Sequence, residues 1–256
     1  MRLDVYLYKN GLCRSRTKAA EAIEKGTVSV NGKIVLKTSF DVEEKDEIGL
    51  REENISFVSN GGYKLEKAFA DFGFPVESLV FADVGASTGG FTDCLLKHGA
   101  KKVFAVDVGE SQLSEELKSN EKVVVTDNFN ARNLTANDLG EYVDGAVCDV
   151  SFISLTYVLR PIYDTLKENG FAVVLLKPQF ECGKKYLNKN GIVNSEKARE
   201  EAAMKIFNFA NSIGFTVSDF TNAPLREGKN VEYLFYLKKN GEKKISAETV
   251  KKRVVV

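Results

Sequence analysis

The sequence predicts an α/β protein whose larger part is a doubly wound, mostly parallel sheet. From residue 61 onward, near-continuous runs of Val, Ala and Leu alternate with helical segments, as expected for strands buried on both faces. A glycine-rich turn, residues 85–90, follows the first of these strands. A smaller α+β segment precedes them, and its Asn31-Gly32 pair between alternating residues is a strong signal for a two-residue β-hairpin.

Residues 1–49 are predicted to form the small domain. Leu3 and Leu7 lie four residues apart on one helical face, and Gly11 ends that helix. Ser15 or Thr17 can cap a second helix. Two short strands then flank the Asn-Gly turn, so the domain reads as a helix pair followed by a hairpin.

The charged segment 50–60 is expected to link this domain to a larger one, residues 61–256. The elements predicted in the larger domain follow one another as helix 62–73, strand 79–84, helix 90–98, strand 102–107, helix 110–118, strands 122–126 and 144–149, helix 153–168, strand 171–176, helix 195–213, and a final strand pair, 215–221 and 231–238, at an antiparallel edge.

Basic residues gather at the N-terminus of a chain whose formal net charge is zero. Residues 1–40 hold eight basic and three acidic residues. Arg14, Arg16 and Lys18 lie at a predicted helix N-terminus, where acidic residues are the usual choice. The free N–H groups there also attract phosphate. These residues are candidate contacts to phosphate, although a solvated basic face is an alternative.

Cysteine and histidine usage excludes several kinds of site. The four cysteines, Cys13, Cys94, Cys148 and Cys182, form no C-x-x-C pair, so we expect reduced thiols, a cytoplasmic location and no metal site. His98 is the only histidine and is interpreted as a surface or capping residue. The chain shows no signal peptide and no apolar run long enough for a membrane span.

The glycine-rich turn indicates the kind of cofactor. Gly85, Gly89 and Gly90 lack the middle glycine of the G-x-G-x-x-G dinucleotide fingerprint, which lets a pyrophosphate approach the backbone. Asp83, two residues before the turn, would also repel a diphosphate. This pattern favours a cofactor with an ammonium group and no phosphate, and S-adenosylmethionine (SAM) is such a cofactor.

Aspartates follow the next strands at the same edge of the predicted sheet. Asp107 lies 22 residues after Gly85, where a carboxylate can accept ribose hydroxyls. Asp127 ends the following strand, in a position to meet the adenine, and Asp149 ends the one after it. A single aspartate at a strand end is often only a turn residue or cap, but four in register with a glycine turn favour a nucleoside-containing cofactor.

Two lysines and a glutamate complete a candidate catalytic set with Asp149. Lys177 follows the buried strand 171–176, Lys64 lies in the helix before the first strand, and Glu232 begins the last strand. A lysine can serve as a base where burial and a cationic neighbour favour its neutral form. If Lys177 stays protonated, it acts instead by orienting the attacking group, and the sequence leaves both roles open.

The chain resembles a known family from end to end. The matching segments are RLDVYLYKNGLCRSRTKAAEAIEKGTVSVNGK, GGYKLEKA, DVGASTGGFTDCLL, AVDVG, CDVSFISL, LLKPQFE, KNGIV and NVEYL. They are similar to the TlyA (hemolysin A) family of rRNA 2′-O-methyltransferases, whose Rossmann-like FtsJ-type (RrmJ-type) SAM-dependent domain follows an RNA-binding domain of the ribosomal-protein-S-four type. Two departures are Asn60, where the family is expected to carry arginine, and a shorter loop between Pro224 and Asn230.

The resemblance implies a role for each candidate residue. Lys64, Asp149, Lys177 and Glu232 would be catalytic. The methionine end of SAM would contact Asp83, Gly85, Ser87, Gly89 and Gly90. The ribose of SAM would contact Asp107, and its adenine would contact Asp127. Arg2, Arg14, Arg16 and Lys18 would contact RNA.

The resemblance also implies a function, and it leaves alternatives open. We expect ribose 2′-O-methylation of ribosomal RNA or ribosomal subunits, with no metal and no stable membrane association. The alternatives are a membrane-active hemolysin, a non-catalytic RNA-binding assembly factor and a small-molecule methyltransferase. The modified nucleotide, the oligomeric state and the role of the basic C-terminal tail stay open.

Overall fold

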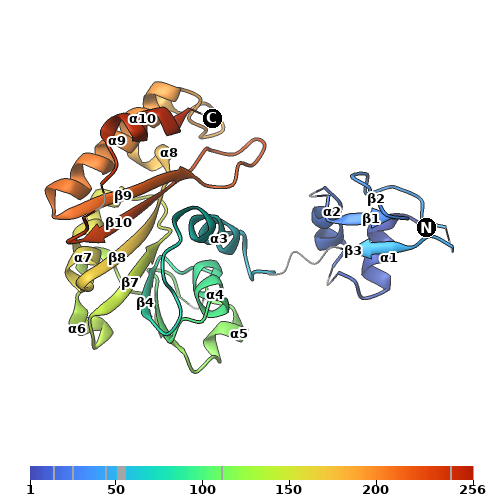
Figure 1. Cartoon of the computed structure of the whole chain (residues 1–256), viewed down its shortest axis with the longest axis horizontal. Coiled ribbons are helices and arrows are strands. Elements are labelled where there is room, and N and C mark those ends of the chain that lie inside the picture. The colour runs from blue at the N-terminus through green and yellow to red at the C-terminus, as the bar shows by residue number, and fades with distance from the viewer. Residues whose placement is uncertain are drawn as a thin grey trace. The chain divides into compact units, whose positions relative to one another are not determined.

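The computed structural model describes residues 1–13, 15–24, 26–43, 45–50, 56–110, 112–242 and 244–255. The chain divides into two compact units, Met1–Ser56 and Phe57–Val256 (Figure 1). The predicted boundaries, which place the linker at residues 50–60, stay a prediction. Arg14 lies outside the described residues.

The N-terminal unit is a helix pair on a small antiparallel sheet. Its elements are α1 (Leu3–Lys9), α2 (Arg16–Glu24), β1 (Val28–Val30), β2 (Lys33–Ile34) and β3 (Ile48–Leu50), and the strand order is β2-β1-β3. Asn31 and Gly32 both have positive φ, 51° and 77°, which is the geometry of the tight hairpin turn that their sequence predicts. The Oγ of Ser15 accepts the N–H of Lys18 and so caps α2.

The core of this unit comes from the predicted helical faces and the hairpin. Leu3 and Leu7 of α1 pack with Ala19 and Ile23 of α2, and all four are fully buried. The third strand was not expected, because β3 lies inside a charged segment with weak alternation.

The C-terminal unit contains a seven-stranded sheet in the order β6-β5-β4-β7-β8-β10-β9. Its strands are β4 (Val80–Val84), β5 (Lys102–Val106), β6 (Val123–Thr126), β7 (Val143–Cys148), β8 (Leu166–Leu176), β9 (Phe215–Asn222) and β10 (Tyr233–Lys239). The pairs from β6 to β8 are parallel, whereas β10 pairs antiparallel with both β8 and β9. The last two strands therefore form the predicted antiparallel edge, with β10 inserted between β8 and β9.

Helices cover both faces of this sheet (Figure 1). They are α3 (Asn60–Phe72), α4 (Gly90–Lys97), α5 (Glu115–Lys118), α6 (Ala136–Leu139), α7 (Leu159–Thr165), α8 (Pro178–Glu181), α9 (Glu196–Ser212) and α10 (Ala247–Val254), with 3₁₀ turns η1 (Ala131–Asn133), η2 (Leu155–Tyr157) and η3 (Lys184–Tyr186). In Figure 1, α3, α4 and α5 lie on one side of the sheet and α7, α9 and α10 on the other.

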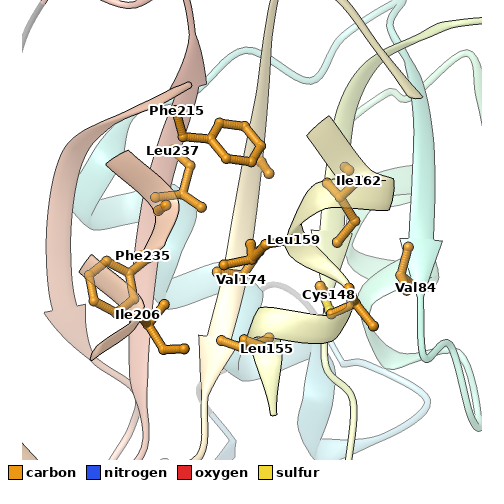
Figure 2. Close-up of a cluster of buried hydrophobic side chains, with 14 of the residues drawn as sticks. Val84, Cys148, Leu155, Leu159, Ile162, Val174, Ile206, Phe215, Phe235 and Leu237 are labelled. Carbon is orange, nitrogen blue, oxygen red and sulfur yellow. The ribbon is translucent and has the colours of Figure 1, made fainter. Parts of the chain in front are cut away.

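A continuous apolar core fills the layer beneath α7, α9 and α10. Figure 2 shows Val84, Cys148 and Val174 from neighbouring strands facing Leu159 and Ile206 from the helices. The small residues Ala82, Ala146 and Ala172 of this core are also fully buried, which lets the helices approach the sheet closely.

The basic C-terminal segment is partly a packed helix. Val250 and Val254 of α10 are fully buried, and the hydroxyl of Tyr233 donates to the carbonyl oxygen of Val254 at 2.9 Å. Arg253 donates to the carboxylate of Asp219. The segment 247–254 is therefore part of the folded unit.

Candidate active site

The carboxyl ends of the parallel strands meet at one edge of the sheet, where the site lies. Asp107 follows β5, Asp149 follows β7 and Lys177 follows β8. Because β10 runs antiparallel to β8 and Tyr233 pairs with Leu176, Glu232 lies next to Lys177 at this edge. The strand order thus gathers residues that are far apart in the sequence.

The four residues of the predicted catalytic set lie together in one ion-paired cluster. The Nζ of Lys64 is 2.7 Å from Oε2 of Glu232 and 3.6 Å from Oδ2 of Asp149. The Nζ of Lys177 is 2.5 Å from Oδ1 of Asp149 and donates to the hydroxyl of Ser151 at 2.8 Å. Asp149 therefore joins the two lysines.

These side chains are mostly shielded from water. Their exposed fractions lie between 11% for Lys177 and 19% for Asp149. Two ammonium groups and two carboxylates give the cluster no formal net charge. Opposite charges this close and this shielded hold one another in fixed positions more firmly than exposed pairs do.

Glycine is required where the turn after β4 approaches its neighbours. Gly85 has a φ of +84°, and a Cβ there would lie 2.9 Å from the carbonyl oxygen of Asp149. A Cβ on Gly90 would lie 2.3 Å from the Oγ of Ser59 and 2.8 Å from the backbone N of Gly62. The glycine at position 90 therefore lets the N-terminus of α3, which carries Lys64, approach the start of α4.

Asp107 braces this turn. Its Oδ2 accepts the N–H of Ser87 and its Oδ1 accepts the N–H of Gly109, both at 2.8 Å. Each carboxylate oxygen still has a second lone pair for a ligand hydroxyl. Ser87 itself adopts a positive φ of 48°, a strained conformation that such contacts maintain.

Two adjoining cavities open at this edge. The larger, about 480 Å³, is lined by Gly85, Asp107 and Asp149 among others. The smaller, about 150 Å³, is lined by Gly85, Gly90, Asp149 and Lys177. Ser87 and Ser151 line both. Two predicted catalytic residues, Asp149 and Lys177, therefore share cavity walls with predicted cofactor residues.

Three predicted cofactor residues, Asp83, Gly89 and Asp127, lie elsewhere than on these walls. Asp83 is fully buried beneath the turn, where Oδ2 accepts the hydroxyl of Thr92 at 2.7 Å. Asp127 does not line either cavity, whereas Phe129 and Asn130, just after it, line the larger one. The roles of Asp83, Gly89 and Asp127 in cofactor binding stay predictions.

Other lining residues were not singled out from the sequence. Phe152 is 90% exposed, has a φ of +63° and lies with its ring centroid 5.0 Å from that of Phe180. Arg132 lines the same cavity, with its guanidinium 4.8 Å from the ring centroid of Tyr157. The only sequence signal for Phe152 is its position three residues after Asp149. Its exposure depends on the local fold and cannot be read from the sequence.

Two of the predicted RNA-binding arginines are oriented by one acidic residue. Asp4 is 5% exposed and accepts hydrogen bonds from Arg2, at 2.9 Å, and from Arg16, at 2.8 Å. The hydrogen bonds from Arg2 and Arg16 lower the pKa of Asp4 to about 2. Lys18 pairs with Glu21 on the surface. These residues thus form an exposed basic face with two fixed guanidinium groups.

The fold and the site define the class of protein. A doubly wound sheet with a glycine turn, an aspartate at the end of the second strand and a cavity at the strand ends is the architecture in which α/β enzymes bind their ligands. Within the described residues, every helix is too short or too polar to cross a membrane.

Comparison with known proteins identifies the family. Residues 57–239 match the FtsJ-like methyltransferase family, and residues 1–48 match the S4 domain. The chain belongs to the FtsJ-like methyltransferase family and carries an N-terminal S4 domain.

Similar proteins cover nearly the whole chain. It is 42% identical over 236 residues to "Hemolysin A" of Brachyspira hyodysenteriae, covering 91% of this chain and 98% of that protein. It is 36% identical over 249 residues to "16S/23S rRNA (cytidine-2'-O)-methyltransferase TlyA" of Mycobacterium tuberculosis, covering 96% and 93%. A solved structure described as a hemolysin from Streptococcus thermophilus superposes with a TM-score of 0.75 at 37% identity, covering 99% of this chain and 94% of that one.

Proposed function

We propose that this protein transfers a methyl group from SAM to a ribose 2′-hydroxyl of ribosomal RNA. The observation that carries the proposal is the shielded cluster of Lys64, Asp149, Lys177 and Glu232, of which Asp149 and Lys177 line the smaller cavity. The family and the relative named as an rRNA (cytidine-2'-O)-methyltransferase support the same reaction. Because its proposed substrate belongs to the ribosome, we place the protein in the cytoplasm.

The residues present fit SAM. The larger cavity offers the carboxylate of Asp107 to ribose hydroxyls and the apolar side chains of Val108 and Phe129 to a base. Gly85 lines both cavities and brings no side chain into them. An Oδ1 of Asp83 that is buried without a hydrogen-bond partner lies behind the turn and would favour a nearby ammonium group. When bound, SAM supplies an electrophilic methyl group.

The chain's own residues position the attacking hydroxyl and relieve it of its proton. Lys177 is the cluster's lysine that lines the smaller cavity beside the glycine turn, so we assign it the contact with the 2′-oxygen. As a neutral amine it accepts the hydroxyl proton, and as an ammonium it orients the oxygen lone pair. Asp149 and Ser151 hold its Nζ in place, and Glu232 holds Lys64.

The rim of the cavity suits a nucleotide. Phe152 presents an exposed aromatic face beside Ser151, and unstacked bases are commonly recognised by stacking on such faces. Arg132, on the same cavity, can pair with a phosphate. These features favour a nucleic-acid substrate over a small molecule.

Replacement of Lys177 tests the assignment. We expect Lys177→Ala to abolish methyl transfer to ribosomal RNA in a tritiated-methyl assay while calorimetry shows nearly unchanged SAM affinity. The matched control is Lys102→Ala, a lysine at the amino end of β5 that pairs with Glu141, and it should keep wild-type transfer. Normal transfer by Lys177→Ala would reject the catalytic role. Mapping ribose methylation of rRNA with and without the protein would identify the nucleotide.

A further inference from the structure

A second cluster of reactive side chains lies between α3 and α4. Glu66 of α3 faces Cys94 of α4 and His98, the C-cap residue of α4. The Nε2 of His98 is 2.6 Å from Oε2 of Glu66, and the Sγ of Cys94 is 3.7 Å from the same oxygen. The three potential ligand atoms all lie within 4.8 Å of one another.

The three groups are the donors that zinc prefers. Thiolate sulfur, imidazole nitrogen and carboxylate oxygen are its usual protein ligands, in a tetrahedral arrangement. Cys94 and His98 are four residues apart, so they project from the same side of α4. Glu66 adds a ligand from the neighbouring helix, a position that no local sequence pattern indicates.

The surroundings prepare the cluster and leave one side accessible. Cys94 is 1% exposed, whereas the side chains of His98 and Glu66 are 17% and 35% exposed. The ring of Phe69 lies against that of His98, with a centroid separation of 4.0 Å, and fixes its orientation. Burial first, and then Glu66, raise the pKa of the Cys94 thiol, so in the free protein this thiol stays protonated.

We propose that Glu66, Cys94 and His98 bind one thiophilic divalent cation of the Zn²⁺ type. On binding, Cys94 releases its thiol proton to solvent. The thiolate and the carboxylate then balance the two positive charges of the ion. Neutral His98 keeps its ring proton on Nδ1 and offers the lone pair of Nε2 to the ion. Three protein ligands leave the fourth tetrahedral position to water on the side of Glu66.

Such an ion would join the two helices that flank the active site. Lys64 lies two residues before Glu66 on α3, and α4 begins directly after the glycine turn. The ion would thus hold the middle of α3 against the C-terminal half of α4 without contacting the cavities. This inference does not depend on the methyl-transfer reaction proposed above.

Titration of the full-length protein with Co²⁺, followed by displacement with Zn²⁺, tests the site. We expect one Co²⁺ per chain and a thiolate-to-cobalt charge-transfer absorption in the near ultraviolet. Cys94→Ser should abolish that absorption, and Glu66→Gln and His98→Gln should each weaken the affinity at least roughly tenfold. The matched control is Cys182→Ser, which removes a half-buried thiol outside the cluster and should leave the absorption unchanged.

Thermal unfolding gives a second readout. Zn²⁺ should raise the unfolding temperature of the wild type and of Cys182→Ser, and at the same concentration it should raise that of Glu66→Gln, which keeps the shape of the side chain, by clearly less. If Cys94→Ser does not fold, Glu66→Gln and His98→Gln decide the question. Absence of the thiolate–cobalt absorption in the wild type, or its persistence at full strength in Cys94→Ser, would overturn the proposal.

Discussion

At the scale of single residues, Asp83 is the most unusual ionisable group at the site. Its side chain is fully buried, with the hydroxyl of Thr92 as a hydrogen-bond donor. Burial raises the pKa of Asp83 to about 7, and the nearby carboxylates of Asp149 and Asp107 act in the same direction. The ionised form is therefore costly unless a cation lies close to it.

This shift predicts how stability depends on pH. The pKa of Asp83 is higher in the folded than in the unfolded chain, so the folded state binds more protons between pH of about 4 and 7. Stability should fall as pH rises through that range. Asp83→Asn removes this titration. The free energy of unfolding of the variant minus that of the wild type should therefore increase by up to about 4 kcal/mol between pH 4 and pH 8, at 1.36 kcal/mol per pKa unit.

Urea unfolding across this pH range measures the difference. Asp164→Asn, which changes a half-exposed aspartate paired with Arg160, is the comparison and should follow the wild type. A constant difference between Asp83→Asn and the wild type at all pH values would show that Asp83 does not titrate in this range.

At the scale of elements, Glu181 joins three segments around the active site. Its side chain is 1% exposed and accepts hydrogen bonds from the backbone N–H of Leu155 at 2.7 Å, the hydroxyl of Ser154 at 2.6 Å and the Nζ of Lys205 at 2.8 Å. It ends α8, the short helix that begins directly after Lys177. Glu181 thus ties the loop that follows Asp149 to the helix that follows Lys177, and both to α9.

Glu181→Gln should disturb this connection, because the amide presents a donor where the site already supplies three donors. We expect kcat for methyl transfer to fall by up to about a hundredfold through misplacement of the catalytic residues, with a loss of stability of about 1–3 kcal/mol. SAM affinity should change less than kcat. Glu141→Gln, at the exposed pair with Lys102, is the control. An unchanged kcat would remove Glu181 from a positioning role.

The elements also show which features were predictable from sequence. The strand ends could be predicted, because buried parallel strands appear in the sequence as apolar runs and their carboxyl ends meet at one edge of the sheet. Asp149 and Lys177 were located in this way, whereas Lys64 and Glu232 needed the family motif as well. Helices α6 and α8 were missed, since four residues carry hardly one turn of periodicity. Contacts such as Glu181–Leu155 and Glu66–His98 join separate elements and leave no local pattern.

At the scale of the whole molecule, the charge distribution assigns different tasks to the two units. The chain is neutral overall, yet residues 1–40 carry eight basic residues against three acidic ones. Asp4 pairs with Arg2 and Arg16 and orients their guanidinium groups on the basic face of this unit. We therefore expect phosphate contacts to come mainly from the N-terminal unit.

Salt dependence of RNA binding tests this division. Replacing Arg14, Arg16 and Lys18 with glutamine should make the slope of log affinity against log salt concentration less steep by about two to three. Each phosphate contact releases counterions when RNA binds, so fewer contacts mean that fewer counterions are released. The control replaces Lys101, Lys102 and Lys122, which lie at the amino ends of β5 and β6, opposite the cavities, and removes the same charge. If both triple variants change the slope equally, net charge alone governs binding. If only the N-terminal variant does, the basic face of the S4 domain contacts the RNA backbone.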